Sequence, residues 1–188
     1  AEVKGIREQE SRREYLTMEE LNVLAATPCD RPIIKRAALF SALTGMRHVD
    51  IQKLKWGEIV KDGDHWRVNF TQQKTKGVEY TPISKQAYQL CGERHDDKRL
   101  VFESLPSPSW ISDPLARWIK AAGITKHITF HCFRHTFATL QLANGTDIYT
   151  VSKMPGHTKV RTTQIYTKVV DAKKETAADA IRLDTLTE

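Results

Sequence analysis

Positions 129–140 read T-F-H-C-F-R-H-T-F-A-T-L, and this stretch carries two histidines and an arginine on a predicted helix over residues 130–143. His131 and Arg134 are three residues apart, so on a helix they share a face. His135 faces elsewhere on the same helix and is given no catalytic role. Taken alone, such a pair is typical of polar residues at a helix start, so its meaning depends on the rest of the chain.

Two further polar residues follow this stretch. Gly156-His157 comes after a predicted helix that ends near Lys153, and Tyr166 lies nine residues beyond His157 on a predicted helix over residues 159–167. Separately they indicate a turn with a histidine and a core tyrosine whose hydroxyl has a partner.

Two more candidates precede the stretch. Arg47 follows Thr44-Gly45-Met46 between two predicted helices, and Asp50 three residues later is expected to orient it. Lys74 lies in a turn, Gln-Gln-Lys-Thr-Lys-Gly, where an exposed lysine is ordinary.

The predicted elements are mostly helices. Thr17 and Glu20 form a capping-box pattern at the first helix, a second begins at Pro32 and stops before Gly45, and a third covers residues 49–54. Three β-prone pieces at 58–60, 65–70 and 78–81 are separated by turn signals at 62–64 and 76–77. Helices are then predicted from Ser84, before Gly123, and over 130–143, 146–153, 159–167 and 172–183, with a break at 105–109. The fold class predicted is mainly α with a small three-stranded antiparallel sheet.

Charge favours a polyanionic partner. The 188 residues carry a formal net charge of +6. Positions 153–174 alone hold six basic residues and one acidic residue.

The three cysteines have no CxxC spacing, which argues against a disulfide framework or a zinc site. No apolar run approaches the roughly 20 residues of a membrane span, and no signal peptide is visible. We therefore expect a reduced, cytoplasmic domain, and the initial Ala suggests a piece of something longer.

Together these residues resemble the catalytic domain of tyrosine recombinases, the phage integrase family. That family shows T-G-x-R with an acid three residues on, a hairpin lysine, H-x-x-R-H-x-x-A-T, G-H, and a tyrosine nine residues later. The resemblance covers roughly residues 15–175, and its wording is closest to integrases of mobile elements in Bacteroidetes-like bacteria. Pro155 replaces the usual leucine before Gly-His, and Cys132 stands where an acid is common.

The resemblance implies a site and a mechanism. The catalytic residues would be Arg47, Lys74, His131, Arg134, His157 and the nucleophile Tyr166. The arginines would bind the scissile phosphate, Tyr166 would form a 3′-phosphotyrosine, and Lys74 would protonate the departing 5′-oxygen. His131 would assist proton transfer, and His157 would donate a hydrogen bond to a phosphate oxygen. No cofactor and no metal are implied.

The same resemblance sets expectations for organisation and partners. Residues 1–15 would be a linker, 16–171 the catalytic domain and 172–188 a helical tail, with the N-terminal core-binding domain absent. The partner would be double-stranded DNA in a bacterial cytoplasm, with accessory DNA-bending proteins. The full-length protein would act as a tetramer and the domain alone as a monomer, while docking of the tail in cis or in trans stays open.

Three alternatives remain at this point. A type IB topoisomerase shares the mechanism without exchanging partners. A non-catalytic DNA-binding remnant would keep the fold without the reaction. A helical protein–protein module would carry the motifs by accident and would show no salt-sensitive DNA binding.

Overall fold

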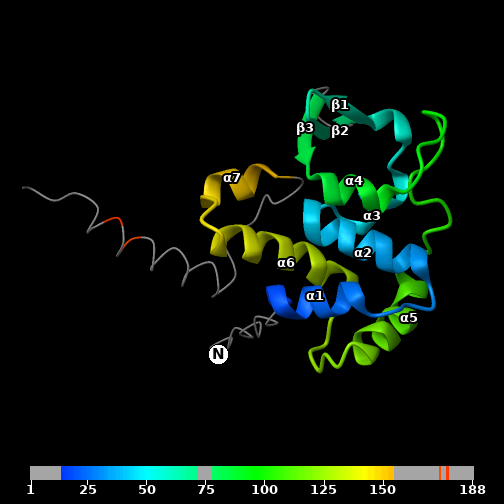
Figure 1. Cartoon of the computed structure of the whole chain (residues 1–188), viewed down its shortest axis with the longest axis vertical. Helices are drawn as coiled ribbons and strands as arrows, with labels where there is room; N and C mark the ends of the chain where they lie inside the picture. The colour runs from blue at the N-terminus through cyan, green and yellow to red at the C-terminus, as the bar shows by residue number, and fades with distance from the viewer. Residues whose placement is uncertain (1–13, 72–77, 155–173, 175–176, 178–188) are drawn as a thin grey trace, which may run out of the picture.

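The computed structural model describes residues 14–71, 78–154, 174 and 177. Seven α-helices, one 3-10 helix and one sheet are defined within these residues (Figure 1). The helices are α1 (Met18–Ala26), α2 (Pro32–Thr44), α3 (His48–Lys53), α4 (Lys85–Cys91), α5 (Pro108–Ala121), α6 (Phe130–Ala143) and α7 (Ile148–Lys153), with η1 at Trp56–Glu58. The strands are β1 (Ile59–Asp62), β2 (His65–Thr71) and β3 (Val78–Ile83). The predicted fold class is confirmed.

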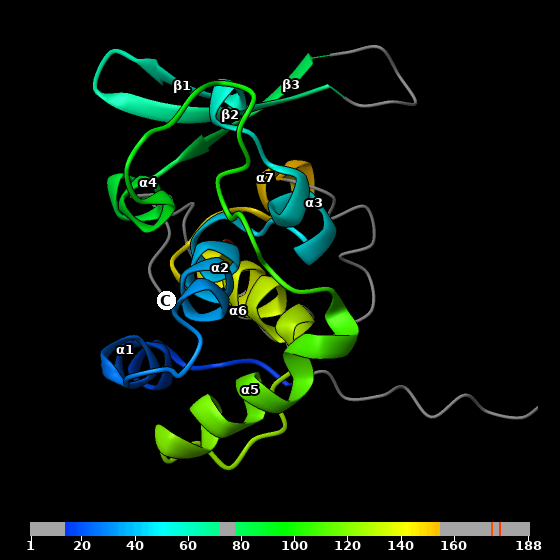
Figure 2. The ribbon, with the colours of Figure 1, turned by 90° about the vertical axis from the view of Figure 1, so that its right-hand side faces the viewer.

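The sheet is antiparallel in the order β1-β2-β3, so β2 is the central strand. Val68 on β2 lies opposite Ile59 on β1 and Thr81 on β3, and its buried side chain faces the core. Figure 2 shows the sheet at one end of the molecule and α1 and α5 at the other, with α2 and α6 between them. The molecule is thus a helical body with a small sheet at one end.

The core is built around α2 and α6. Phe40 of α2 packs on Phe102 with ring centroids 5.1 Å apart, and Phe133 of α6 stacks on Trp118 of α5 at 6.2 Å. All four rings are almost fully buried. Fully burying a large apolar side chain stabilises the fold by roughly 1.5–3 kcal/mol. Residues of α2, α5 and α6 therefore share one buried core.

Several predicted boundaries are confirmed. Thr17 accepts from the Glu20 backbone N–H while the Glu20 carboxylate accepts from the Thr17 N–H, which is the predicted capping box. α2 begins at Pro32, and Gly45 follows it with φ 75°, a left-handed conformation that suits glycine. α6 spans the predicted 130–143.

Several boundaries differ from prediction, and those of β3, α5 and α7 have a clear physical reason. β3 continues to Ile83, because the edge strand needs no N–H from Pro82, which lies opposite Arg67. α5 begins at Pro108, inside the predicted break, because a proline is favoured in the first helical turn. α7 begins at Ile148 rather than 146, since Asp147 caps it by accepting from the Thr150 N–H.

The predicted helix over 159–167 lies outside the described residues. Of the predicted helix over 172–183, only Lys174 and Ala177 are described, and both are helical. Within the described residues, no helix is long and apolar enough to cross a membrane.

Candidate active site

The turn between α2 and α3 fixes the backbone of Arg47. The Gly45 N–H donates to the Ser41 carbonyl at 2.8 Å, and the Ser41 hydroxyl donates to the Met46 carbonyl at 2.7 Å. Ser41 and Met46 are fully buried, so these bonds are shielded from water. Arg47 then stands as the N-cap residue of α3 with an extended backbone. The turn therefore points the Arg47 side chain outward from a rigid base.

Asp50 holds the Arg47 guanidinium, as the sequence predicted. The Arg47 Nε donates to Asp50 Oδ2 at 2.8 Å, and Nη2 donates to Oδ1 at 3.3 Å. This hydrogen bond raises the pKa of Arg47 further, against the opposing effect of partial burial. The Arg47 side chain is 53% exposed, so the fork is oriented yet still open to a ligand.

Helix α6 supplies the second half of the site. His131 and Arg134 lie on its first turns; His131 is exposed, whereas Arg134 is 5% exposed. Cys132 occupies the helix position that a capping-box acid often fills. Its Sγ lies 3.4 Å from both the backbone N and the Oγ1 of Thr129. Cys132 differs from the acid that is common at this position, but its sulfur still caps the start of α6 in place of a carboxylate.

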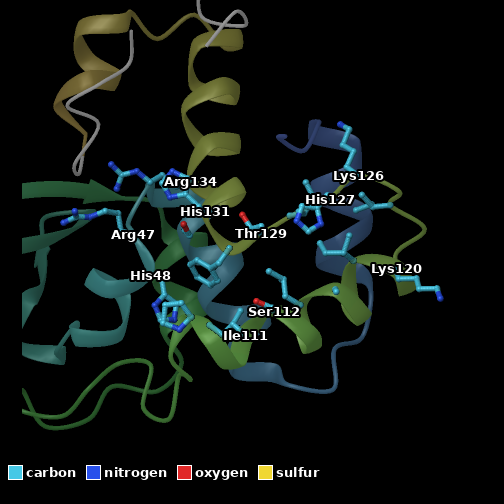
Figure 3. A pocket seen from close by; sticks show the side chains of 18 of the residues that line it. Arg47, His48, Ile111, Ser112, Lys120, Lys126, His127, Thr129, His131 and Arg134 are labelled. Atoms are coloured by element: carbon cyan, nitrogen blue, oxygen red, sulfur yellow. The ribbon is translucent and has the colours of Figure 1, made fainter. Parts of the chain in front are cut away.

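The two halves meet in one pocket (Figure 3). Its volume is about 540 Å³, and Arg47, His131 and Arg134 all line it. The middle is apolar and lies between α5 and the segment before α6, with Ile111, Leu115, Ile119, Ile124 and Ile128 on its walls. The far end carries Lys120, Lys126 and His127. No acidic side chain of the described residues lines the pocket, so its field favours an anion.

Lys126, at the far end of the pocket, contacts the first described residues of the chain. Lys126 Nζ donates to Glu20 Oε2 at 2.7 Å and to the Tyr15 carbonyl at 3.0 Å, and it lies 5.3 Å from the Tyr15 ring centroid. Partial burial opposes ionisation of Glu20, but its bonds with Lys126 and Thr17 leave its pKa lowered. Lys126 therefore helps fix the segment that enters α1.

Three of the six predicted site residues, Arg47, His131 and Arg134, are thus brought together. Lys74, His157 and Tyr166 lie outside the described residues. His48 and Thr129 also line the pocket, and neither was singled out from the sequence. His48 directly follows the T-G-x-R turn, but that adjacency alone does not reveal what its ring contacts.

Comparisons with known proteins show the family and the fold of this chain. The model of the phage integrase family matches residues 14–173. Tyrosine recombinase XerD of Lacticaseibacillus casei is 30% identical over 168 residues, covering 79% of this chain and 56% of XerD. The integrase of Escherichia phage P2 is 30% identical over 187 residues, covering 97% of this chain and 50% of that integrase. The chain therefore spans about half the length of these curated relatives.

Solved structures share the fold. The XerA recombinase superposes with a TM-score of 0.68 at 24% identity, covering 96% of this chain and 68% of XerA. The catalytic domain of bacteriophage HP1 integrase gives a TM-score of 0.63 at 20% identity, covering 93% of this chain and 98% of that domain. The finer resemblance to Bacteroidetes integrases stays a prediction. The motif order, the pocket and these comparisons lead to one conclusion: the chain belongs to the phage integrase family, with the fold of tyrosine recombinase catalytic domains.

Proposed function

We propose that this chain is the catalytic domain of a site-specific DNA recombinase, an integrase that cleaves and rejoins strands through a covalent 3′-phosphotyrosine. The observation that carries the proposal is the convergence of Arg47 and Arg134 on one pocket, with His131 on the same helix as Arg134. Arg47 and Arg134 are far apart in the chain, and both carry a permanent positive charge at this pocket. No acidic side chain of the described residues lines the pocket wall.

This arrangement suits a phosphodiester. Negative charge grows on the non-bridging oxygens during attack, and stabilising it is the main task of a phosphoryl-transfer site. Guanidinium groups bind such oxygens in a planar, bidentate way and do not lose their charge. Asp50 takes two of the five Arg47 N–H donors, which leaves three for a phosphate.

The resemblance supplies the steps. The Tyr166 oxygen attacks the scissile phosphorus, and the bond to the 5′-oxygen breaks. The tyrosine loses its proton during the attack and His131 assists proton transfer. Lys74 protonates the leaving 5′-oxygen, and His157 donates a hydrogen bond to a phosphate oxygen. A 5′-hydroxyl from the partner strand then attacks the phosphotyrosine, and the phenol regains its proton. Each cleaved phosphodiester is exchanged first for the phosphotyrosine ester and then for a new phosphodiester. The reaction therefore needs no nucleotide triphosphate as an energy source.

Double-stranded DNA is the proposed partner, in a bacterial cytoplasm. Similar folds include XerH bound to its difH substrate and lambda integrase bound to a core site. We further propose a tetramer on DNA for the longer protein, with accessory DNA-bending proteins, and a monomer for this domain alone. Residues 16–171 are the proposed catalytic unit, with 1–15 as linker and 172–188 as tail.

Trapping tests the proposal. The full-length protein is incubated with tiled, nicked suicide duplexes from the DNA that flanks its own gene, and covalent adducts are separated under denaturing conditions. We expect an adduct that Tyr166→Phe abolishes and that Tyr149→Phe leaves intact, since Tyr149 is an exposed residue of α7.

Each other outcome selects an alternative. An adduct that survives Tyr166→Phe would mean that the nucleophile is wrong. Salt-sensitive DNA binding without any adduct would favour a non-catalytic remnant. Relaxation of supercoils without strand exchange between two marked duplexes would favour a type IB topoisomerase.

A further inference from the structure

Helix α3 is hydrogen-bonded to the segment before α5 through the side chains of His48 and Gln52. These residues lie four apart and donate to two consecutive carbonyls of the segment before α5. The His48 Nε2 lies 2.9 Å from the Pro106 oxygen, and the Gln52 Nε2 donates to the Leu105 oxygen at 3.1 Å. A carbonyl only accepts, so the His48 Nε2 must carry the hydrogen.

The surroundings of His48 favour its neutral form. Its ring meets Phe130 edge-on, with centroids 5.0 Å apart and planes at 88°. Burial lowers the pKa of His48, and the bond to Pro106 offsets part of this effect. The Nδ1 atom is buried, and within residues 14–71 and 78–154 it has no hydrogen-bond partner. Protonation would therefore place an N–H on a buried atom that has no acceptor among these residues.

Several titratable or charged residues line the same pocket as His48. The preceding turn contributes Arg47, and α6 contributes His131 and Arg134 to the pocket that His48 also lines (Figure 3). The pocket residues from the start of α5, Pro108, Ile111 and Ser112, do not titrate. On α3 itself, Asp50 is engaged with the Arg47 guanidinium. Burial is the cause that lowers the pKa of His48, and among these described neighbours none offers a free carboxylate to favour the charged ring.

We propose that His48 is a positioning residue for Arg47: its Nε2–H bond to Pro106 holds the first turn of α3 against the segment before α5 and against α6. Arg47 directly precedes that turn, so loss of the bond lets its guanidinium shift relative to Arg134. This inference rests on the function proposed above. It assigns His48 no contact with DNA and no proton transfer.

The way α3 is joined to the segment before α5 changes along the chain. Farther along, the α3–η1 segment is joined to residues 97–101 by main-chain bonds, including Val101 N–H to the Leu54 carbonyl at 2.8 Å and Trp56 N–H to the Arg99 carbonyl at 3.0 Å. Near Arg47, the link from α3 to the segment before α5 is made by side chains, those of His48 and Gln52.

Three variants of the full-length protein test this role. His48→Gln keeps an N–H donor near the position of Nε2 and cannot be protonated, whereas His48→Asn is too short to reach Pro106. Val49→Ala, at an exposed neighbour on α3, is the matched control. The measurements are the single-turnover cleavage rate at saturating suicide duplex, the half-saturating DNA concentration, and the rate between pH 5.5 and 8.

We expect His48→Asn to slow cleavage about ten-fold or more while the half-saturating DNA concentration stays within about two-fold. His48→Gln should restore the rate to within about three-fold and weaken its fall at acid pH. Nitrogen-15 shifts of the folded wild type should show the neutral Nε2–H tautomer of His48 at pH 7.

The inference is overturned if His48→Asn cleaves like the wild type, if His48→Gln is as slow as His48→Asn, or if the shifts show an Nδ1–H ring. A wild type that forms no adduct is a different result, because it contradicts the proposed function itself. The tautomer measurement needs no DNA, so the two failures are distinguishable.

Discussion

Leu16 and Thr136, 120 positions apart, are joined by a buried hydrogen bond in which the Leu16 N–H donates to the Thr136 Oγ1 at 2.9 Å. Thr136 also donates to the Cys132 carbonyl at 2.8 Å, one turn back on α6. The segment that enters α1 is thereby fixed to the helix that carries Arg134.

Thr136→Val should therefore lower the free energy of unfolding by about 1–3 kcal/mol, because it leaves the buried Leu16 N–H without an acceptor. Thr139→Val is the matched control: Thr139 is also buried and also donates to the carbonyl one turn back, that of His135. Denaturant unfolding should show a clearly smaller loss for Thr139→Val. Equal losses would contradict the role given to the bond with Leu16.

Asp50→Asn should slow strand cleavage about ten-fold, because the Arg47 guanidinium loses its charged partner and its orientation. Both side chains are partly exposed, so the unfolding free energy should change by less than about 1 kcal/mol. Asp97→Asn is the control, since Asp97 pairs with Arg94 at the same three-residue spacing away from the pocket. Cleavage that is equally slow in both variants would show that the effect is not local to Arg47.

Acid should destabilise the fold through His48. Burial lowers the pKa of His48 in the folded chain, so the unfolded chain binds more protons below about 6.5. The stabilising contribution is complete above that pH and is lost as the pH falls toward the lowered folded value. Thermal melts from pH 7.5 to 5 should show a steeper loss in the wild type than in His48→Gln. Parallel curves would mean that His48 does not carry this dependence.

Cys91 should resist alkylation in the folded protein. Burial raises the pKa of its thiol to about 12, opposed by the nearby Arg36 cation. At pH 8 only about one thiol in ten thousand would be a thiolate. Iodoacetamide followed by mass spectrometry should label the partly exposed Cys29 first and Cys91 only under unfolding conditions. Labelling of both at the same rate would contradict the packing of α4 on α2.

The local signals were enough to predict most elements. A capping box at Thr17, a glycine after α2 and a strong helical stretch at 130–143 act within a few residues, so the sequence predicts them well. The pairing of Arg47 with Asp50 is local too, because the two residues are three positions apart at the start of α3.

Other features depend on distant contacts. A proline usually marks the end of a helix or strand, yet α5 begins at Pro108 and β3 continues through Pro82. Whether a proline ends an element or belongs to it depends on the neighbouring elements. The role of His48 is set by a carbonyl 58 positions away, which no local pattern specifies. The chemical roles of all six site residues remain predictions, and for Lys74, His157 and Tyr166 so does their position.

The proposed pocket of Arg47, His131 and Arg134 binds the phosphodiester that Tyr166 attacks, so the position of the covalent bond is the decisive measurement. The trapped protein–DNA adduct is digested with nuclease and trypsin, and the peptide that retains a nucleotide is sequenced by mass spectrometry. We expect a 3′-phosphonucleotide on Tyr166 and a large loss of adduct in Arg47→Ala and Arg134→Ala. A nucleotide on any other residue, or an undiminished adduct in both arginine variants, would contradict it.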